Sequence, residues 1–112
     1  MALLIVQASS EDTVAAPGNR APNYVCVSVT SAVGAPVTGL TAANFKVDPL
    51  IVGAGGALVN ITSAQPVRLP GTYIVEVVPI GTQTWKAGFY IFAVAVARGA
   101  DQGQALCKVK MD

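Results

Sequence analysis

The sequence predicts an all-β protein, folded as an antiparallel β-sandwich of about seven strands. Apolar residues recur at every second position in several short segments, most regularly in residues 23–30 (NYVCVSVT). These segments are bounded by Gly, Pro and Asn, which interrupt strands and form turns. No stretch keeps the helical period over the length of an ordinary helix.

The length of 112 residues suits one domain and is too short for two ordinary ones. Charged residues make up 12% of the chain and hydrophobic residues 53%, which argues against disorder. The high hydrophobic content also indicates that some apolar surface remains exposed after one small core is filled, as at a docking interface. We predict an N-terminal edge strand or arm in residues 1–21 and a β-sandwich domain in residues 22–112.

In the first half of the chain, strands alternate with connections rich in Gly and Pro. Residues 3–6 predict a short edge strand, and residues 8–21 a loop or loosely held arm. In residues 23–30, the three valines share the buried face. Thr41 can cap one helical turn, after which residues 45–47 return to extended chain. The remaining predictions are an edge piece at Pro36-Val37, a break at Asp48-Pro49, a strand past a bulge in residues 50–52, and a turn in residues 53–56.

The second half contains the most apolar strand, within residues 85–98 (WKAGFYIFAVAVAR). It is apolar on both faces, which is typical of a central strand covered on each side. A helix of this length is the alternative, but Gly88, Gly99 and the aromatic and β-branched content favour a strand. The other predictions are strands in residues 57–62, 72–80 and 106–111, a loop in residues 63–70, and a hairpin turn in residues 98–103.

The composition excludes several classes of function. The sequence contains no histidine, which removes Ser-His and Cys-His nucleophiles, imidazole bases and histidine metal sites. We therefore predict no enzyme activity, no cofactor and no metal. The net charge of +1, with basic residues spread singly, offers no footprint for nucleic acid. No apolar run reaches the length of about 18 residues that a membrane span needs, so we predict no membrane insertion.

The first residues, MALLIV, lack both the basic region and the apolar length of a signal peptide. Two interpretations stay open. Either the protein is intracellular, or it is secreted or displayed at the cell surface after a leader has been removed.

Several patches resemble a known family. Val27-x-Val29, a turn, and then GAPVTGLTAANF (residues 34–45) resemble bacterial immunoglobulin-like and carboxypeptidase-regulatory-like domains, where a strand leads into G-x-P-V-x-G-L and a buried Phe. The steps Gly71-x-Tyr73 and Trp85-x-x-Gly88-x-Tyr90 resemble strand starts in the C-terminal half of the same domains. The resemblance covers roughly residues 23–111.

This resemblance implies an immunoglobulin-like sandwich. It also implies a role as a spacer, an adhesin module, or a unit that contacts protein or carbohydrate. The chain lacks the Asp-rich turn of the calcium-binding members, so the resemblance implies no metal site.

Cys26 and Cys107 are the only cysteines, and two interpretations of them stay open. A disulfide would tie an early strand to the last one and would stabilise the fold by about 2–4 kcal/mol. Strand parity favours two free thiols that pack as small hydrophobic groups, because Cys26 lies opposite the valine face of its strand and Cys107 lies opposite two lysines. No histidine is present to activate either thiol as a nucleophile.

The tyrosines and the single tryptophan are the other candidates. Tyr90 is predicted to form a tyrosine corner at the start of the apolar strand, and Tyr73 is the second candidate for that structural role. Trp85 in an exposed loop, beside Gln83 and Lys86, would stack on a sugar ring. A lid over one end of the core is the favoured interpretation of Trp85, because a domain this small usually needs its one Trp for packing.

The remaining candidates are three carboxylates and one face of the apolar strand. Asp48, Glu76 and Asp101 lie on different elements, and nothing in the sequence brings two of them together as a glycosidase would need. The face that carries Tyr90, Phe92, Val94 and Val96 has two interpretations, a subunit interface or burial under the N-terminal segment.

The favoured function is a non-catalytic structural or protein-interaction module, as one piece of a larger surface or particle assembly. Its partner would be another protein or a second copy of the chain in a homo-oligomer. The alternative function is a carbohydrate-binding module that uses Trp85, Gln83 and Lys86.

Overall fold

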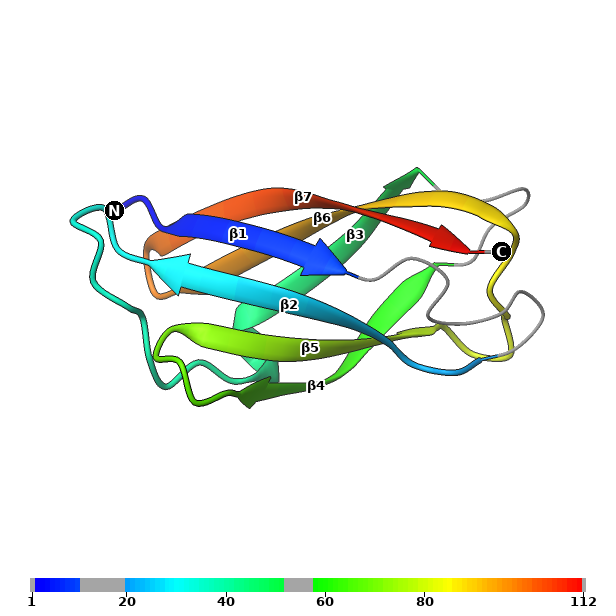
Figure 1. Ribbon diagram of the computed structural model, residues 1–112, viewed down its shortest axis with the longest axis horizontal. Coiled ribbons are helices and arrows are strands. Elements are labelled where there is room, and N and C mark those ends of the chain that lie inside the picture. The colour runs from blue at the N-terminus through cyan, green and yellow to red at the C-terminus, as the bar shows by residue number, and fades with distance from the viewer. Residues whose placement is uncertain (1, 11–19, 52–57, 112) are drawn as a thin grey trace.

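The computed structural model describes residues 2–10, 20–51 and 58–111. The described residues confirm the predicted fold class, because they form seven strands in two antiparallel sheets packed as a β-sandwich (Figure 1). Their one helical piece is a single 3₁₀ turn, η1 (Ala42–Asn44). The strands are β1 (Ile5–Ser10), β2 (Asn23–Thr30), β3 (Phe45–Ile51), β4 (Val59–Pro66), β5 (Thr72–Pro79), β6 (Gly88–Arg98) and β7 (Asp101–Met111).

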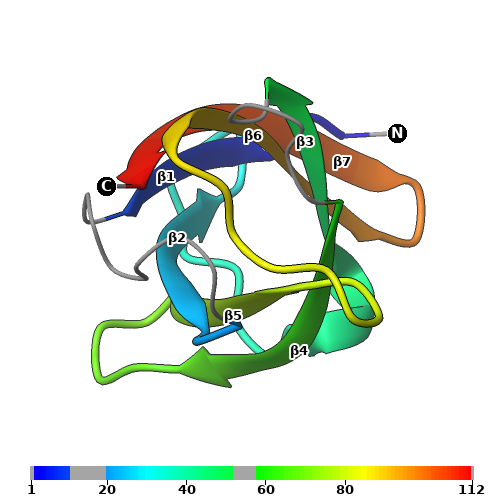
Figure 2. The same cartoon turned by 90° about the vertical axis from the view of Figure 1, so that its right-hand side faces the viewer.

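The two sheets contain four and three of these strands. One sheet has the order β1-β2-β5-β4 and the other the order β3-β6-β7, and all neighbouring strands are antiparallel. This is the strand order of the constant-type immunoglobulin sandwich, so the topology agrees with the immunoglobulin-like fold predicted from the sequence. The two layers are seen from the side in Figure 1 and end-on in Figure 2.

The space between the sheets is filled by valines and aromatic side chains. Val25, Val27 and Val29 of β2 are fully buried, as the alternation in this strand predicts. In β5 the burial alternates around Glu76, which lies on the wetter side of the strand as expected. The largest fully buried side chains are Trp85, Tyr73, Tyr90 and Phe92. One continuous core therefore joins the two sheets.

The N-terminal segment closes one side of the sandwich, where β1 lies beside β7 (Figure 2). Leu4 and Val6 belong to the same core as the other strands, so this segment is an integral edge of the sandwich. Residues 2–4 run beside the start of β7, where the Leu4 amide donates to the Gln102 carbonyl at 2.9 Å and the Gln102 amide donates to the Ala2 carbonyl at 3.2 Å. The predicted loop in residues 8–21 is wrong at its start because β1 pairs with β2 as far as Ser10. Residues 11–19 of that loop lie outside the described residues.

The predicted turn and bulge before and within β3 are confirmed. Thr41 precedes η1, and its amide donates to the Asn44 side chain at 2.8 Å, which is the capping arrangement. The chain returns to extended structure at Phe45, and the β3–β6 register shifts between Pro49 and Ile51. The predicted break at Asp48-Pro49 is wrong, because both residues pair with β6 and β3 continues to Ile51. The turn predicted in residues 53–56 lies outside the described residues.

Two strands extend further than their sequences predict. β4 continues through residues 63–66, which the sequence assigns to a loop, because this polar segment pairs with β5 past a register shift. β7 begins at Asp101 rather than near Leu106, because Arg98 pairs with Asp101 across a two-residue turn. Gly99 in that turn has a φ of 61°, a left-handed conformation that suits tight hairpins. Cross-strand pairing thus overrides the polar composition of both segments.

Candidate functional site

The inner face of β6 is buried by the chain itself. Tyr90, Phe92, Val94 and Val96 are at most 1% exposed and lie in the core between the sheets. The interpretation of this face as a subunit interface is therefore wrong, since no part of it reaches the surface. The N-terminal segment covers only one side of the sandwich. The other strands of the four-stranded sheet therefore also help to bury this face of β6.

The opposite face of β6 points out of the sandwich and forms the centre of an apolar surface. Phe89 is 51% exposed, and Leu106 on the neighbouring strand β7 is 65% exposed. Between and beside them lie half-buried Ile91, Ala93 and Ala95. We call this surface the outer β6 face; it consists of Phe89, Ile91, Ala93, Ala95 and Ala97 of β6, Gln102, Gln104, Leu106, Lys108 and Lys110 of β7, and Lys46 and Asp48 of β3.

The outer face of the other sheet mixes apolar and polar side chains. β2 presents Tyr24 and Cys26 beside Ser28 and Thr30. The neighbouring β5 presents half-buried Ile74 and Val78 on either side of Glu76, whose carboxylate accepts a hydrogen bond from Thr62 at 2.6 Å. On β6, by contrast, all five outer residues are apolar.

The charges on the outer β6 face are mostly positive and lie around the apolar centre. Lys46 and Asp48 lie on one side, on β3, and Lys108 and Lys110 lie on the other, on β7. The Lys108 ammonium lies 5.3 Å from the centre of the Phe89 ring, a cation–π distance. A shallow hollow lies where the β6 side chains are only alanines, lined by Ala93, Ala95, Gln104 and the β3 residues 46–48.

Trp85 is fully buried, with 0% of its side chain exposed. Its indole N–H donates to the Ala21 carbonyl at 2.8 Å, and its ring meets the Tyr90 ring edge-on at 5.4 Å. The favoured interpretation of Trp85 as a lid over one end of the core is confirmed. The sugar-stacking platform is wrong in its main element, because no face of the indole reaches solvent.

The two residues expected beside Trp85 do not join it at the surface. The Gln83 side-chain oxygen accepts a hydrogen bond from the Leu58 amide at 2.9 Å, which holds the 80–87 connection against the start of β4. Lys86 is exposed, and its backbone amide donates to the Tyr90 hydroxyl at 3.0 Å. Both residues thus serve the connection into β6.

Tyr90 and Tyr73 hold loops to the sandwich. The Tyr90 hydroxyl bonds back to the backbone four residues upstream, near the start of the sixth strand, which is the tyrosine-corner arrangement predicted from the sequence. The Tyr73 hydroxyl donates to the Val37 carbonyl at 2.7 Å and accepts from the Leu40 amide at 3.3 Å. Tyr73 therefore fixes the connection between β2 and β3.

Both cysteines are free thiols, and they lie in different sheets. The two free thiols that strand parity favours over a disulfide are therefore confirmed. Cys107 is buried in the core, where desolvation raises the pKa of its thiol. Cys26 is exposed on the outer face of β2, so its prediction as a packed hydrophobic group is wrong. The valines occupy the inner positions of β2 and leave Cys26 on the solvent side.

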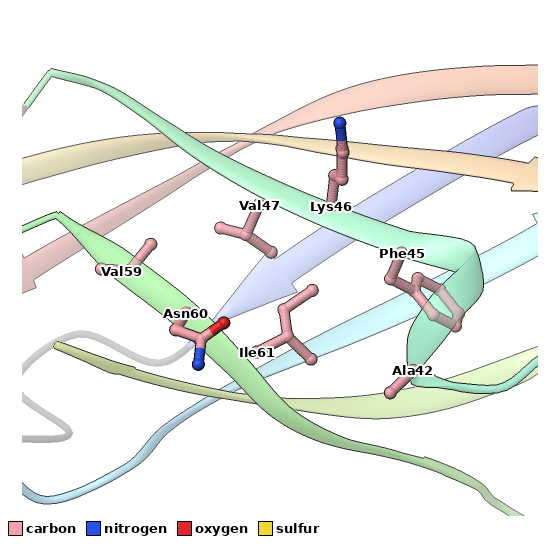
Figure 3. A pocket seen from close by; sticks show the side chains of 7 residues that line it. All are labelled: Ala42, Phe45, Lys46, Val47, Val59, Asn60 and Ile61. Carbon is pink, nitrogen blue, oxygen red and sulfur yellow. The ribbon is translucent and has the colours of Figure 1, made fainter. Parts of the chain in front are cut away.

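The open side of the sandwich, where β3 approaches β4, contains a narrow groove of about 230 Å³ (Figure 3). Val47 of β3 lies across this groove from Val59 and Ile61 of β4, while Lys46 points away from it (Figure 3). The residues that line the groove include no carboxylate and no nucleophile. The two edge strands contain Pro49 and Pro66 and a register shift each, features that hinder the addition of a further strand.

The three carboxylates among the described residues do not converge. Asp48 lies on the three-stranded sheet, Glu76 on the four-stranded sheet, and Asp101 at the β6–β7 turn, where it accepts a hydrogen bond from the Ala2 amide. In the described part of the chain, no group of three or more His, Cys, Asp and Glu residues is placed to hold a metal ion. None of the described helical structure is long and apolar enough to cross a membrane.

No protein-family model, curated protein or solved structure matches the chain. The resemblance to bacterial immunoglobulin-like and carboxypeptidase-regulatory-like domains therefore rests on sequence motifs alone.

Proposed function

We propose that the protein is a non-catalytic structural or protein-interaction module that contacts a protein partner through the outer β6 face. The observation that carries this proposal is the exposure of Phe89, at one end of the central strand β6, and of Leu106 on the edge strand β7, together with half-buried Ile91. Covering such a patch removes apolar surface from water at a gain of about 25 cal/mol per Å². The patch therefore favours association with another apolar surface.

The shape of the surface supports contact with a protein rather than a small ligand. The alanines of β6 leave the face flat or slightly hollow, with bulkier groups only at one end and along β7. Protein interfaces have an apolar centre and a polar, solvated rim, and the lysines around the alanines match that anatomy. The absence of histidine from the sequence supports the non-catalytic part of the proposal.

The edges of the sandwich support contact through a face rather than through strand addition. β1 is joined to β7 by residues 2–4, and β3 and β4 contain prolines and register shifts. These features leave few straight stretches of free backbone for an added strand.

Photo-crosslinking tests this proposal in cells that express the chain. A photoreactive phenylalanine analogue is placed at Leu106 or, as a matched control, at Leu69, which is 67% exposed in the connection between β4 and β5. We expect crosslinks to protein from position 106 and few from position 69, since only the first lies on the outer β6 face. Equal crosslinking from both positions, or none from position 106, would contradict the proposal.

A further inference from the structure

We infer that the outer β6 face binds a second copy of the same chain, in an antiparallel two-fold arrangement that stacks β6 on β6. This inference rests on the proposed function and names the partner of the same surface. It follows from the area of the face, from the distribution of large and small side chains on it, and from the order of its charges.

The area of the face is close to what a pairwise contact needs. β6 and β7 have 11 residues each, which span about 37 Å at the usual rise of a strand. With strands about 4.8 Å apart, these two strands give about 360 Å² of flat area, and the seven residues of β3 add about 110 Å². Two such faces together reach about 940 Å² at full overlap, close to the roughly 1,000 Å² that a specific interface needs.

The side chains on the face are graded in size along β6. One end of β6 has Phe89 and Ile91, and the other end has Ala95 and Ala97. A second hollow lies over the alanine end, lined by Ala95, Ala97, Gln104 and the N-terminal residues 3–6. A two-fold axis across the strands, between Ala93 and Ala95, places Ile91 of each copy over Ala97 of the other, and Phe89 beside the β6–β7 turn that follows the alanine end. The parallel arrangement would instead place Phe89 on Phe89 and leave the alanine ends apart.

The charges are ordered so that this antiparallel arrangement pairs opposite signs. Lys46 lies beside Ala95 in the β3–β6 register, and Asp48 lies beside Ala93. The same axis therefore brings Lys46 of each copy opposite Asp48 of the other, which gives two reciprocal ion pairs. Lys108 lies beside Ile91, and Gln102 lies beside Ala97. In the two-fold arrangement, Lys108 of one copy therefore lies opposite Gln102 of the other. No lysine then faces a lysine across the contact.

A charge-swap experiment tests the inference. The dissociation constant of the dimer is measured by sedimentation equilibrium under reducing conditions for the wild type, Asp48→Lys, and the double variant Lys46→Asp/Asp48→Lys. Glu76→Lys makes the same charge change on the outer face of the other sheet and serves as the control. Emission from the buried Trp85 verifies that each variant is folded.

We expect the wild type to dimerise and Asp48→Lys to raise the dissociation constant about tenfold, since two attractive pairs become repulsive. The double variant restores the opposite-sign pairs and should return to within about threefold of the wild type. Glu76→Lys should leave the constant unchanged. A wild type that stays monomeric, an Asp48→Lys variant that dimerises like the wild type, or a double variant that fails to recover would each overturn the inference.

The outcomes separate this inference from the proposed function. A monomeric wild type that still crosslinks from position 106 to other proteins would refute self-association and leave the interaction module standing. A chain that shows neither dimer nor crosslink from position 106 would refute both.

Discussion

Gly103 has no side chain, which lets residues 2–4 lie directly against β7. Its substitution by alanine tests how much this close approach stabilises the fold. A Cβ atom at Gly103 would lie 2.1 Å from the Leu4 carbonyl oxygen and 2.9 Å from its carbonyl carbon, both backbone atoms. Contacts this short do not occur, so residues 2–4 must move away from β7. The movement breaks the two backbone hydrogen bonds with Gln102 and exposes Leu4, which is 5% exposed in the folded protein.

The cost can be estimated from these parts. Each hydrogen bond contributes about 1 kcal/mol, and burial of the Leu4 side chain contributes about 2 kcal/mol. Alanine is favoured over glycine within a strand by about 0.5–1 kcal/mol, which offsets part of the loss. We therefore expect Gly103→Ala to lower the free energy of unfolding by about 3–3.5 kcal/mol.

Urea denaturation measures this loss, with emission from the single, buried Trp85 as the probe. Gly99→Ala, in the same hairpin, is the control: nothing lies near its added Cβ, and the left-handed backbone alone costs about 1 kcal/mol. A second control deletes residues 1–4, after which Gly103→Ala should cost nothing. A Gly103→Ala protein as stable as the wild type, or an equal loss in the truncated chain, would refute the close approach as the cause.

Four further predictions concern single side chains. Tyr73→Phe should lower the free energy of unfolding by about 1–3 kcal/mol, and more than Tyr90→Phe, because it leaves two backbone partners unsatisfied where Tyr90 has one; equal losses in urea denaturation would contradict this. Cys26 should react quickly with a thiol reagent, and Cys107 only as fast as the protein unfolds. Burial raises the pKa of the Cys107 thiol, so the folded state disfavours the thiolate. The free energy of unfolding should therefore fall as the pH rises past the unfolded thiol's pKa of roughly 8.5. Replacing Cys107 with alanine should remove that part of the pH dependence, and a stability that rises there in the wild type would contradict the sign. Emission from Trp85 should be blue-shifted and should not respond to glycans, whereas a red-shifted, glycan-sensitive emission would revive the sugar-binding alternative.

The alternation of apolar residues was sufficient to predict the fold class and the inner faces. In β2 three alternating valines are buried, so its parity followed directly from the pattern. Parity also favoured two free thiols over a disulfide, because it placed Cys26 and Cys107 on opposite sides of their strands. The tyrosine corner followed from the position of Tyr90 near the start of its strand.

The extents of the strands were less predictable because they depend on partners distant in the sequence. The polar residues 63–66 and 101–105 extend β4 and β7 only because β5 and β6 offer free backbone groups at those positions. Gly103 gives no local sign that residues 2–4 will lie against it.

The outer β6 face was missed because its sequence signal was assigned to the wrong side of the strand. Tyr90 and Phe92 are the larger side chains on one parity of β6, and they fill the core. The exposed surface is formed instead by the alternate residues of β6, which are mostly alanines. They lie next to the face of β7 that carries Leu106, Lys108 and Lys110. Recognising it requires the β6–β7 register, which the sequence alone does not provide.

Light scattering over a range of concentrations, with and without reductant, tests self-association through the outer β6 face most directly. The expected result is a mass that rises toward two chains with concentration and is the same under both conditions. A mass of one chain at every concentration would contradict self-association. A dimer that disappears with reductant would contradict it as well, because a bridge between exposed Cys26 thiols would then explain the association.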